Sequence, residues 1–124
     1  MDDATSLSIG ELANATGVSI SAIRYYEQRT LVTPSGRVGG KRRFGAEALD
    51  RLNFVTRAKQ AGFDLDQVGV LLDDTTGESR DLLAERLEAL KQTRAELDRT
   101  IGFVERAASC GCSNLAQCKR QLEF

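Results

Sequence analysis

The residues with the most distinctive chemistry are three cysteines near the end of the sequence, Cys110, Cys112 and Cys118. They are the only cysteines among 124 residues, and the sequence contains no histidine. Thiolates bind soft acceptors such as Cu(I), Zn(II), Hg(II), other thiophilic ions and iron–sulfur clusters. Gly111 lets the backbone bend sharply between the first two cysteines, so the three thiols can converge in one short loop. The spacing therefore predicts a thiol-based metal or redox site.

The set of available ligands restricts what this site can be. Without histidine, a mixed Cys/His zinc site is excluded, and three thiolates are one short of a closed tetrahedral Cys₄ site. In a reducing compartment the cysteines are expected to be available as ligands or redox groups and not to form structural disulfides. A three-thiolate site, direct thiol oxidation and chemically ordinary exposed cysteines are the alternatives.

A second chemical feature is the basic strip, which runs from Arg24 to Arg43 and holds six basic residues against the single acid Glu27. Cationic side chains neutralise DNA phosphates, and Tyr25 and Phe44 among them can pack on sugar edges. We expect Arg24 to contact a phosphate or a guanine, and Arg37, Lys41, Arg42 and Arg43 to contact mainly phosphates. The expected DNA-binding residues are Ser19, Ser21, Arg24, Tyr25, Arg37, Lys41, Arg42, Arg43 and Phe44. The plainer interpretation is a solvated pair of helices followed by a charged loop.

Charge is distributed unevenly along the sequence. Residues 1–60 hold nine Lys/Arg and six Asp/Glu, a net charge of +3, whereas residues 61–124 hold eight and twelve, a net charge of −4. The basic half contains the basic strip, which favours DNA over a membrane surface as the partner.

No apolar run reaches the roughly 18 residues of a membrane span, and Met1-Asp2-Asp3 is not a signal-peptide start, so we expect a cytoplasmic protein. Without histidine or an acid–nucleophile pair, an enzyme is not expected.

Two short helices must position the basic strip. Ser8-Ile9-Gly10-Glu11 fits a capping box, and Gly17 can supply the left-handed turn that ends the first helix. Ser19 can cap a second helix. The apolar side chains of that helix expected to point inward are Ile20, Ile23 and Tyr26. Two helices joined by a turn with glycine predict a helix-turn-helix, whose second helix enters the major groove, and Gly39-Gly40 then predicts a small hairpin.

Two further helices complete the expected head. Residues 46–61 predict a helix that Gly62 ends, because glycine is favoured just past a helix C-terminus. Asp64 and Gln67 can cap the next helix. The apolar residues assigned to the core are Leu49, Leu52, Phe54, Val55, Leu65, Val68, Leu71 and Leu72. The polar stretch 73–77 then predicts a break.

One long helix is predicted from Ser79 to about Ala108. Its apolar residues follow an a/d heptad pattern in which Arg94 takes one position. This dimer seam consists of Leu83, Leu87, Leu90, Leu97, Ile101 and Val104. A helix roughly 42 Å long with one narrow apolar stripe has little of its own chain to pack against. We therefore expect a homodimer, which would place two recognition helices at half-sites of a near-palindromic operator; the alternative is a helix folded back onto the head.

Three stretches resemble the MerR family of bacterial transcription regulators. They are SIGELANATGVSISAIRYYEQRTLV from Ser8, GGKRRF from Gly39 and QAGFDLDQVGVLL from Gln60. The resemblance is close over residues 8–72 and holds in outline beyond them. It implies a winged helix-turn-helix head, a long dimerisation helix that pairs antiparallel, and a C-terminal effector site. The sequence departs from the family's pattern at Lys41 and Phe44, where aromatic residues are common around the wing arginine.

The same resemblance implies two alternative roles for the cysteines. Cys110 and Cys118 are separated by seven residues, as in copper-sensing CueR-like members, which bind a monovalent ion between two thiolates. Those members lack a cysteine at the start of the dimerisation helix, and residues 75–79 here also contain none. Alternatively, Cys110, Cys112 and Cys118 are similar to the last three cysteines of the SoxR-like [2Fe–2S] loop, whose fourth cysteine corresponds to Ala107. Cys112 has no role in the copper-type loop.

These features predict a mostly α-helical protein in three parts. They are a winged helix-turn-helix DNA-binding domain with a small β wing (1–74), a dimerisation helix in an antiparallel coiled coil (75–108), and a cysteine-containing effector loop and tail (109–124). The expected function is a transcription regulator that senses a thiophilic ion, Cu(I) or a similar one, through these cysteines. By resemblance it distorts promoter DNA and so acts indirectly on RNA polymerase. The alternatives are a SoxR-like redox or iron–sulfur sensor, a thiol-based metal-binding protein without DNA function, and an architectural DNA binder.

Overall fold

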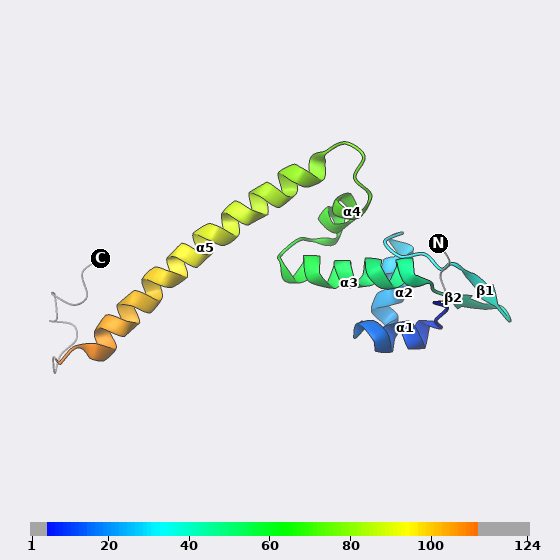
Figure 1. Cartoon of the computed structure of the whole chain (residues 1–124), viewed down its shortest axis with the longest axis horizontal. Coiled ribbons are helices and arrows are strands. Elements are labelled where there is room, and N and C mark those ends of the chain that lie inside the picture. The colour runs from blue at the N-terminus through cyan, green and yellow to red at the C-terminus, as the bar shows by residue number, and fades with distance from the viewer. Residues whose placement is uncertain (1–4, 112–124) are drawn as a thin grey trace. The chain divides into compact units, whose positions relative to one another are not determined.

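The computed structural model describes residues 5–111, in which five helices and one two-stranded sheet are formed (Figure 1). The chain divides into two compact units between Ser79 and Arg80. The elements are α1 (Ile9–Thr16), α2 (Ile20–Gln28), β1 (Gly36–Val38), β2 (Lys41–Arg43), α3 (Ala46–Gln60), α4 (Leu65–Asp73) and α5 (Glu78–Ser109). The predicted fold class, mostly helical with a small β wing and a long final helix, is confirmed.

The helix-turn-helix forms through the caps that the sequence predicts. The Ser8 N–H donates to Glu11 Oε1 at 2.8 Å, and the Glu11 N–H donates to Ser8 Oγ at 3.1 Å, which completes the capping box of α1. Gly17 ends α1 with a φ of 76°, and its N–H donates to the Ala13 carbonyl oxygen. The Ser19 hydroxyl accepts the Ala22 N–H at 3.1 Å and starts α2. A left-handed glycine and a serine cap thus fix where one helix ends and the next begins.

The core of the first unit is made by the facing sides of its helices. Its fully buried large side chains are Leu12, Ile23, Val32, Phe44, Leu52, Val55 and Val68. Two predicted core positions are wrong. Ile20 is 38% exposed, because it is the first residue of α2 and the core does not cover it. Phe54 is 39% exposed, because it lies at the edge of the buried stripe of α3.

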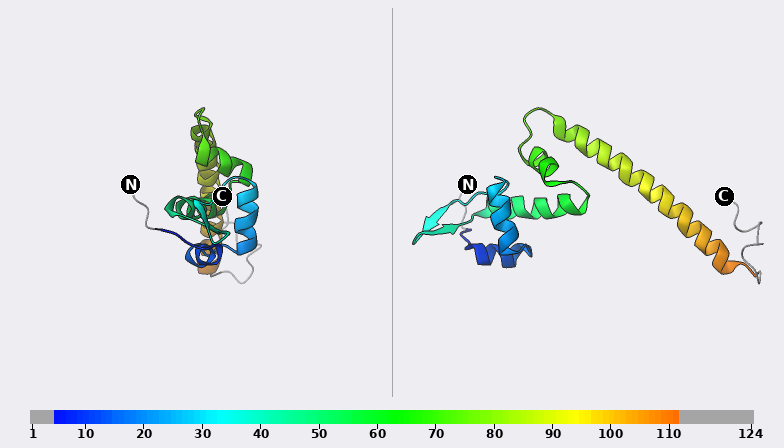
Figure 2. Two further views of the ribbon diagram at one scale, coloured as in Figure 1. Left: turned by 90° about the vertical axis from the view of Figure 1, so that its right-hand side faces the viewer. Right: turned by 180° about the vertical axis from the view of Figure 1, so that it is seen from behind.

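The wing is an antiparallel hairpin that projects from the helices of the first unit (Figures 1 and 2). Arg37 pairs with Arg42 in its register, and Gly39 and Gly40 form the turn with φ values of 59° and 80°. Two consecutive positive φ angles match the tight turn that suits the twist of a two-stranded ribbon. A backbone bridge between Leu7 and Phe44, with N–H to carbonyl distances of 2.9 and 2.8 Å, anchors the base of the wing to the segment before α1.

The second unit contains nearly all of α5, a single 32-residue helix. None of its residues is buried, and all six seam residues expose between 42% and 56% of their surface. Asp74 lies just before the helix and accepts the N–H groups of Thr76, Gly77 and Ser79 at 2.8 to 3.0 Å. No helix in the described residues is both long and apolar enough to cross a membrane.

Candidate nucleic-acid interface

The outer face of α2 carries the polar residues that a recognition helix needs. Ser19, Ser21, Arg24 and Tyr25 are all exposed, with 46% of Tyr25 accessible. Within residues 5–111, Arg24 has no ion-pair or hydrogen-bond partner for its guanidinium group. The opposite face carries Ile23 and Tyr26 into the core. The helix therefore presents an unneutralised guanidinium and two hydroxyl-bearing residue types to the surface, as DNA contacts require.

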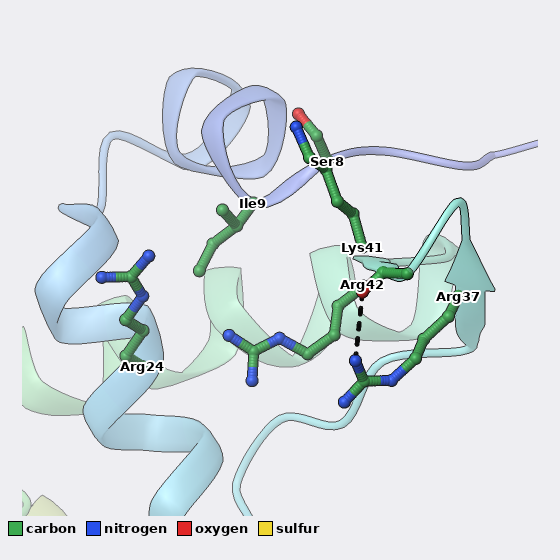
Figure 3. A pocket seen from close by; sticks show the side chains of 7 residues that line it. Ser8, Ile9, Arg24, Arg37, Lys41 and Arg42 are labelled. Atoms are coloured by element: carbon green, nitrogen blue, oxygen red, sulfur yellow. Dashed lines mark hydrogen bonds between the residues drawn. The ribbon is translucent and has the colours of Figure 1, made fainter.

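A hollow of about 560 Å³ lies beside this face, between α2, the start of α1 and the wing. We call it the basic hollow; its lining residues are Ser8, Ile9, Arg24, Arg37, Gly40, Lys41 and Arg42. Figure 3 shows Arg24 extending from α2, and Arg37 and Arg42 extending from the wing. The lining contains four cationic side chains and no acidic one. A concave surface of one charge sign concentrates ions of the opposite sign, so the basic hollow favours an anion such as a phosphate.

The cations of the basic hollow differ in what holds them. Arg37 Nη1 donates to the Gly40 carbonyl oxygen at 3.2 Å, which ties the side chain to the turn of the wing (Figure 3). Arg42 Nη1 lies 3.5 Å from Glu27 Oε1 on α2. Lys41, like Arg24, forms no ion pair within the part of the chain that the structure describes. Two cations are thus oriented by the fold, and two are unpaired.

Two expected DNA contacts are placed differently from the other seven. Phe44 is fully buried, so the prediction that it packs on a sugar edge is wrong; the Leu7 bridge turns its side chain into the core. Arg43 donates to the hydroxyl and carbonyl oxygens of Ser6 at 3.1 and 2.6 Å. It also lies 3.8 Å from the Glu11 carboxylate. The pKa of Glu11 is lowered, first by the Ser8 N–H and then by the charge of Arg43.

Sequence reasoning missed a network around Arg29 at the end of α2. Arg29 Nη1 donates to the Tyr25 hydroxyl oxygen at 3.1 Å, and the guanidinium carbon lies 5.8 Å from the centre of that ring. Arg29 also forms an ion pair with Asp66 in α4. The Tyr25 hydrogen bond and then the charges of Tyr25 and Asp66 raise the pKa of Arg29. The four-residue spacing of Tyr25 and Arg29 was the available signal, because residues at that spacing meet on one helix face.

A second missed group is the clamp between α3 and α4. Arg51 donates through Nη1 and Nη2 to the two carboxylate oxygens of Asp73 at 3.1 and 2.9 Å. Its Nε donates to the Leu31 carbonyl oxygen at 2.6 Å. The hydrogen bonds from Arg51 lower the pKa of Asp73. This arginine stabilises the head and is not available to DNA.

Of the three cysteines, the structure describes Cys110 alone. It follows the last residue of α5, is partly buried, and its N–H lies 3.4 Å from the Ala107 carbonyl oxygen. Cys112 and Cys118 lie outside the described residues. The convergence of the three thiols therefore stays a prediction.

A winged helix-turn-helix with an exposed, cation-bearing second helix defines a DNA-binding protein. Residues 7–75 match the family model described as MerR HTH family regulatory protein, and residues 49–104 match the model described as MerR, DNA binding. The chain belongs to the MerR family and is a DNA-binding transcription regulator.

Individual relatives agree with this assignment. A SoxR homolog of Chromobacterium violaceum, described as an HTH-type transcriptional activator, is 35% identical, over 96% of this chain and 84% of its own. The mercuric resistance operon regulatory protein of Pseudomonas fluorescens is 34% identical, over 86% of this chain and 77% of its own. Among solved structures, HiNmlR, a MerR family regulator lacking the sensor domain and bound to promoter DNA, matches with a TM-score of 0.63 and 25% identity, covering 85% of each chain.

Proposed function

We propose that this regulator is a homodimer that binds promoter DNA through two winged helix-turn-helix heads and responds to a thiophilic ion through Cys110, Cys112 and Cys118. The observation that carries the DNA part is the basic hollow, where Arg24 of the recognition helix and three cations of the wing line one concave surface. Because each phosphate contact releases counterions from DNA, such a surface supplies affinity that falls steeply with salt.

The dimer part is supported by the exposed seam of α5. Six apolar side chains on one stripe, which Arg94 interrupts, are each about half exposed, so this apolar surface is in contact with water. Burial of apolar surface contributes roughly 25 cal/mol per Å² of favourable free energy, so association with a second apolar stripe is favourable. A second copy of α5 supplies that stripe. The antiparallel direction follows the family resemblance.

The sensing part is supported by the donors and by the relatives. Thiolates suit soft ions, and Cys110 directly follows the helix that carries the dimer seam. The relatives include regulators named for mercuric resistance and for heavy metals. In the proposed mechanism, ion binding near the end of α5 shifts the two heads, and the bound duplex is bent and untwisted into a form that polymerase uses.

The DNA part is tested by measuring affinity for a duplex selected from a random-sequence pool, over a range of salt concentrations. The wild-type protein is expected to bind with a steep salt dependence, and Arg24→Ala is expected to weaken binding by about 1–3 kcal/mol if it reads a base. Arg57→Ala is the matched control, since Arg57 is an exposed arginine of α3 that does not line the basic hollow. Equal losses in both variants would contradict the assignment of α2 as the recognition helix.

The sensing part is tested by transcription from that duplex with and without added Cu(I) or Hg(II). We expect an ion-dependent change in the wild-type protein and none in Cys110→Ser or Cys118→Ser. A response that survives both substitutions would show that the cysteines are incidental, as in an architectural DNA binder.

A second candidate is a redox or iron–sulfur sensor, favoured by the relative described as a SoxR homolog. Its weakness is Ala107, because a methyl group in the position of the fourth cysteine cannot bind iron. Anaerobic purification followed by iron analysis and a visible absorption spectrum distinguishes the candidates. Cluster absorption bands would support the redox sensor, whereas one Cu(I) bound per chain without such bands would support the metal sensor.

A further inference from the structure

Glu27 is the single acid within the basic strip, and the contacts described so far give it no role in binding an anion. It lies in the last turn of α2, and 13% of its side chain is exposed. Its Oε1 atom is buried and accepts no hydrogen bond within the described residues. A buried carboxylate oxygen without donors is unfavourable, so the carboxylate depends on a nearby opposite charge.

That charge is Arg42 on β2. The Arg42 Nη1 to Glu27 Oε1 distance of 3.5 Å allows an ion pair, although the alignment does not give a hydrogen bond. Within residues 5–111, no other ion pair or side-chain hydrogen bond joins α2 to the wing. The base of the wing is anchored elsewhere, through the Leu7 bridge and the contacts of Arg43 with Ser6. The Glu27–Arg42 pair is thus the polar link between the recognition helix and the wing.

Arg42 also lines the basic hollow, and Figure 3 shows its side chain extending from the wing toward α2. A guanidinium carries five N–H donors, so a contact at one nitrogen leaves the others available to a phosphate. A long side chain held at one edge loses less rotamer freedom when its remaining donors bind. The contact with Glu27 therefore prepares Arg42 for an anion in the basic hollow.

We propose that Glu27 is a positioning residue for DNA recognition, whose carboxylate, buried at Oε1, holds Arg42 in place across the interface of α2 and the wing without touching DNA. This rests on the proposed function, because the anion in the basic hollow is taken to be a DNA phosphate. The direction in which DNA affinity changes when Glu27 is replaced distinguishes two roles of this residue. Removing an acid from a basic surface raises DNA affinity by simple electrostatics, whereas removing a positioning residue lowers it.

The test compares Glu27→Gln with the wild-type protein on the duplex selected by the wild-type protein. Affinity is expected to fall about threefold to tenfold, in the range of coupling between contacting residues, even though the net charge becomes more positive. In an Arg42→Ala background the same substitution is expected to change affinity by less than about twofold. Asp50→Asn, which removes an exposed acid from α3, is the matched charge control and is expected to leave affinity equal or slightly higher.

Three results would overturn the proposal. They are an equal or higher affinity of Glu27→Gln, an equal loss with and without Arg42, and a wild-type protein that binds no duplex. The third result alone also removes the proposed function. If Glu27→Gln does not fold, Glu27→Asp serves instead, because it keeps the charge but withdraws it by one methylene. Its affinity is expected to fall if position matters, and wild-type affinity would contradict the proposal.

Discussion

At the scale of single residues, the arginines of the head divide by what their guanidinium groups contact. Arg43 and Arg51 bind oxygen atoms of the fold itself, on Ser6 and Asp73. Arg24 and Arg42 line the basic hollow, where Arg42 lies 3.5 Å from Glu27 Oε1 and Arg24 has no ion-pair partner within the described residues. These residues have the same charge in the sequence, and their different roles follow from which neighbours the fold brings within hydrogen-bonding distance.

This difference predicts the effect of Arg42→Ala on DNA binding. We expect lower affinity for all duplexes alike, because a phosphate contact carries no sequence information. The slope of log affinity against log salt should become shallower by about 0.9, because the variant neutralises one phosphate fewer. Binding measured at several salt concentrations checks this, and an unchanged slope would mean that Arg42 does not contact a DNA phosphate.

Phe44 gives a second prediction at this scale. Because its side chain is fully buried, Phe44→Ala should lower the free energy of unfolding by about 3–5 kcal/mol, since the variant buries less apolar surface and leaves a cavity. Denaturant unfolding measures the difference, with Tyr25→Ala as an exposed aromatic control that should cost far less. A Phe44→Ala protein that is as stable as the wild-type protein but binds DNA more weakly would indicate that Phe44 contacts DNA.

At the scale of elements, the sequence predicted the helices well because their signals are local. The Ser8–Glu11 capping box, the Gly17 turn and the Asp64 cap each depend on residues within one turn of chain. The wing turn at Gly39-Gly40 is equally local. Each of these positions is where the sequence predicted it.

Contacts between elements were not predictable in the same way. The Glu27–Arg42 pair and the Arg51–Asp73 clamp join residues that no periodic pattern relates. Phe44 was misplaced because an aromatic residue at the end of a basic run looks exposed, whereas its backbone pairs with Leu7 and its side chain lies fully buried in the core. The cysteine site rests on composition, spacing and family resemblance, since two of its residues lie outside the described part of the chain.

The start of α5 gives a prediction for an element. Hydrogen bonds from Ser79, Thr76 and the neighbouring backbone hold the pKa of Asp74 far below its usual range. A carboxylate with a depressed folded-state pKa stabilises the folded form fully above its unfolded pKa of about 3.9, and this contribution disappears as the pH falls toward the folded value. We therefore expect the first turn of α5 to fray as the pH falls below the unfolded pKa of about 3.9.

Asp74→Asn should show the same fraying at neutral pH, because an amide is a weaker acceptor than a carboxylate. Amide hydrogen exchange at Thr76, Gly77 and Ser79 measures it in both proteins. Exchange that is equally slow in the variant and the wild-type protein would show that Asp74 does not cap the helix.

At the scale of the whole molecule, the two units differ in how much apolar surface they bury within one chain. The first has its own buried core, whereas α5 has no buried residue and an exposed apolar stripe. A unit of this kind is stabilised by a partner, so the stability of the regulator should depend on protein concentration. The proposed DNA affinity depends on the same association, because two heads on one duplex bind with a high effective concentration.

Leu90→Glu tests this dependence. A charge in the seam should convert the dimer to a monomer, because burying an unpaired carboxylate is strongly unfavourable. Sedimentation measures the mass, and DNA affinity is expected to fall with it. Glu88→Gln, a neighbouring substitution outside the seam, should leave both unchanged. A Leu90→Glu protein that stays dimeric would place the interface elsewhere.

The glycine turn of the wing has one further consequence, for anyone who wishes to redesign DNA preference. A Cβ atom at Gly39 or Gly40 would meet nothing within 4 Å, so there is room for side chains at the tip. Both residues nevertheless have positive φ angles, which a side chain makes costly by about 1–2 kcal/mol per residue. Libraries of altered regulators would therefore keep the two glycines and vary Val38 and Lys41, which flank the turn.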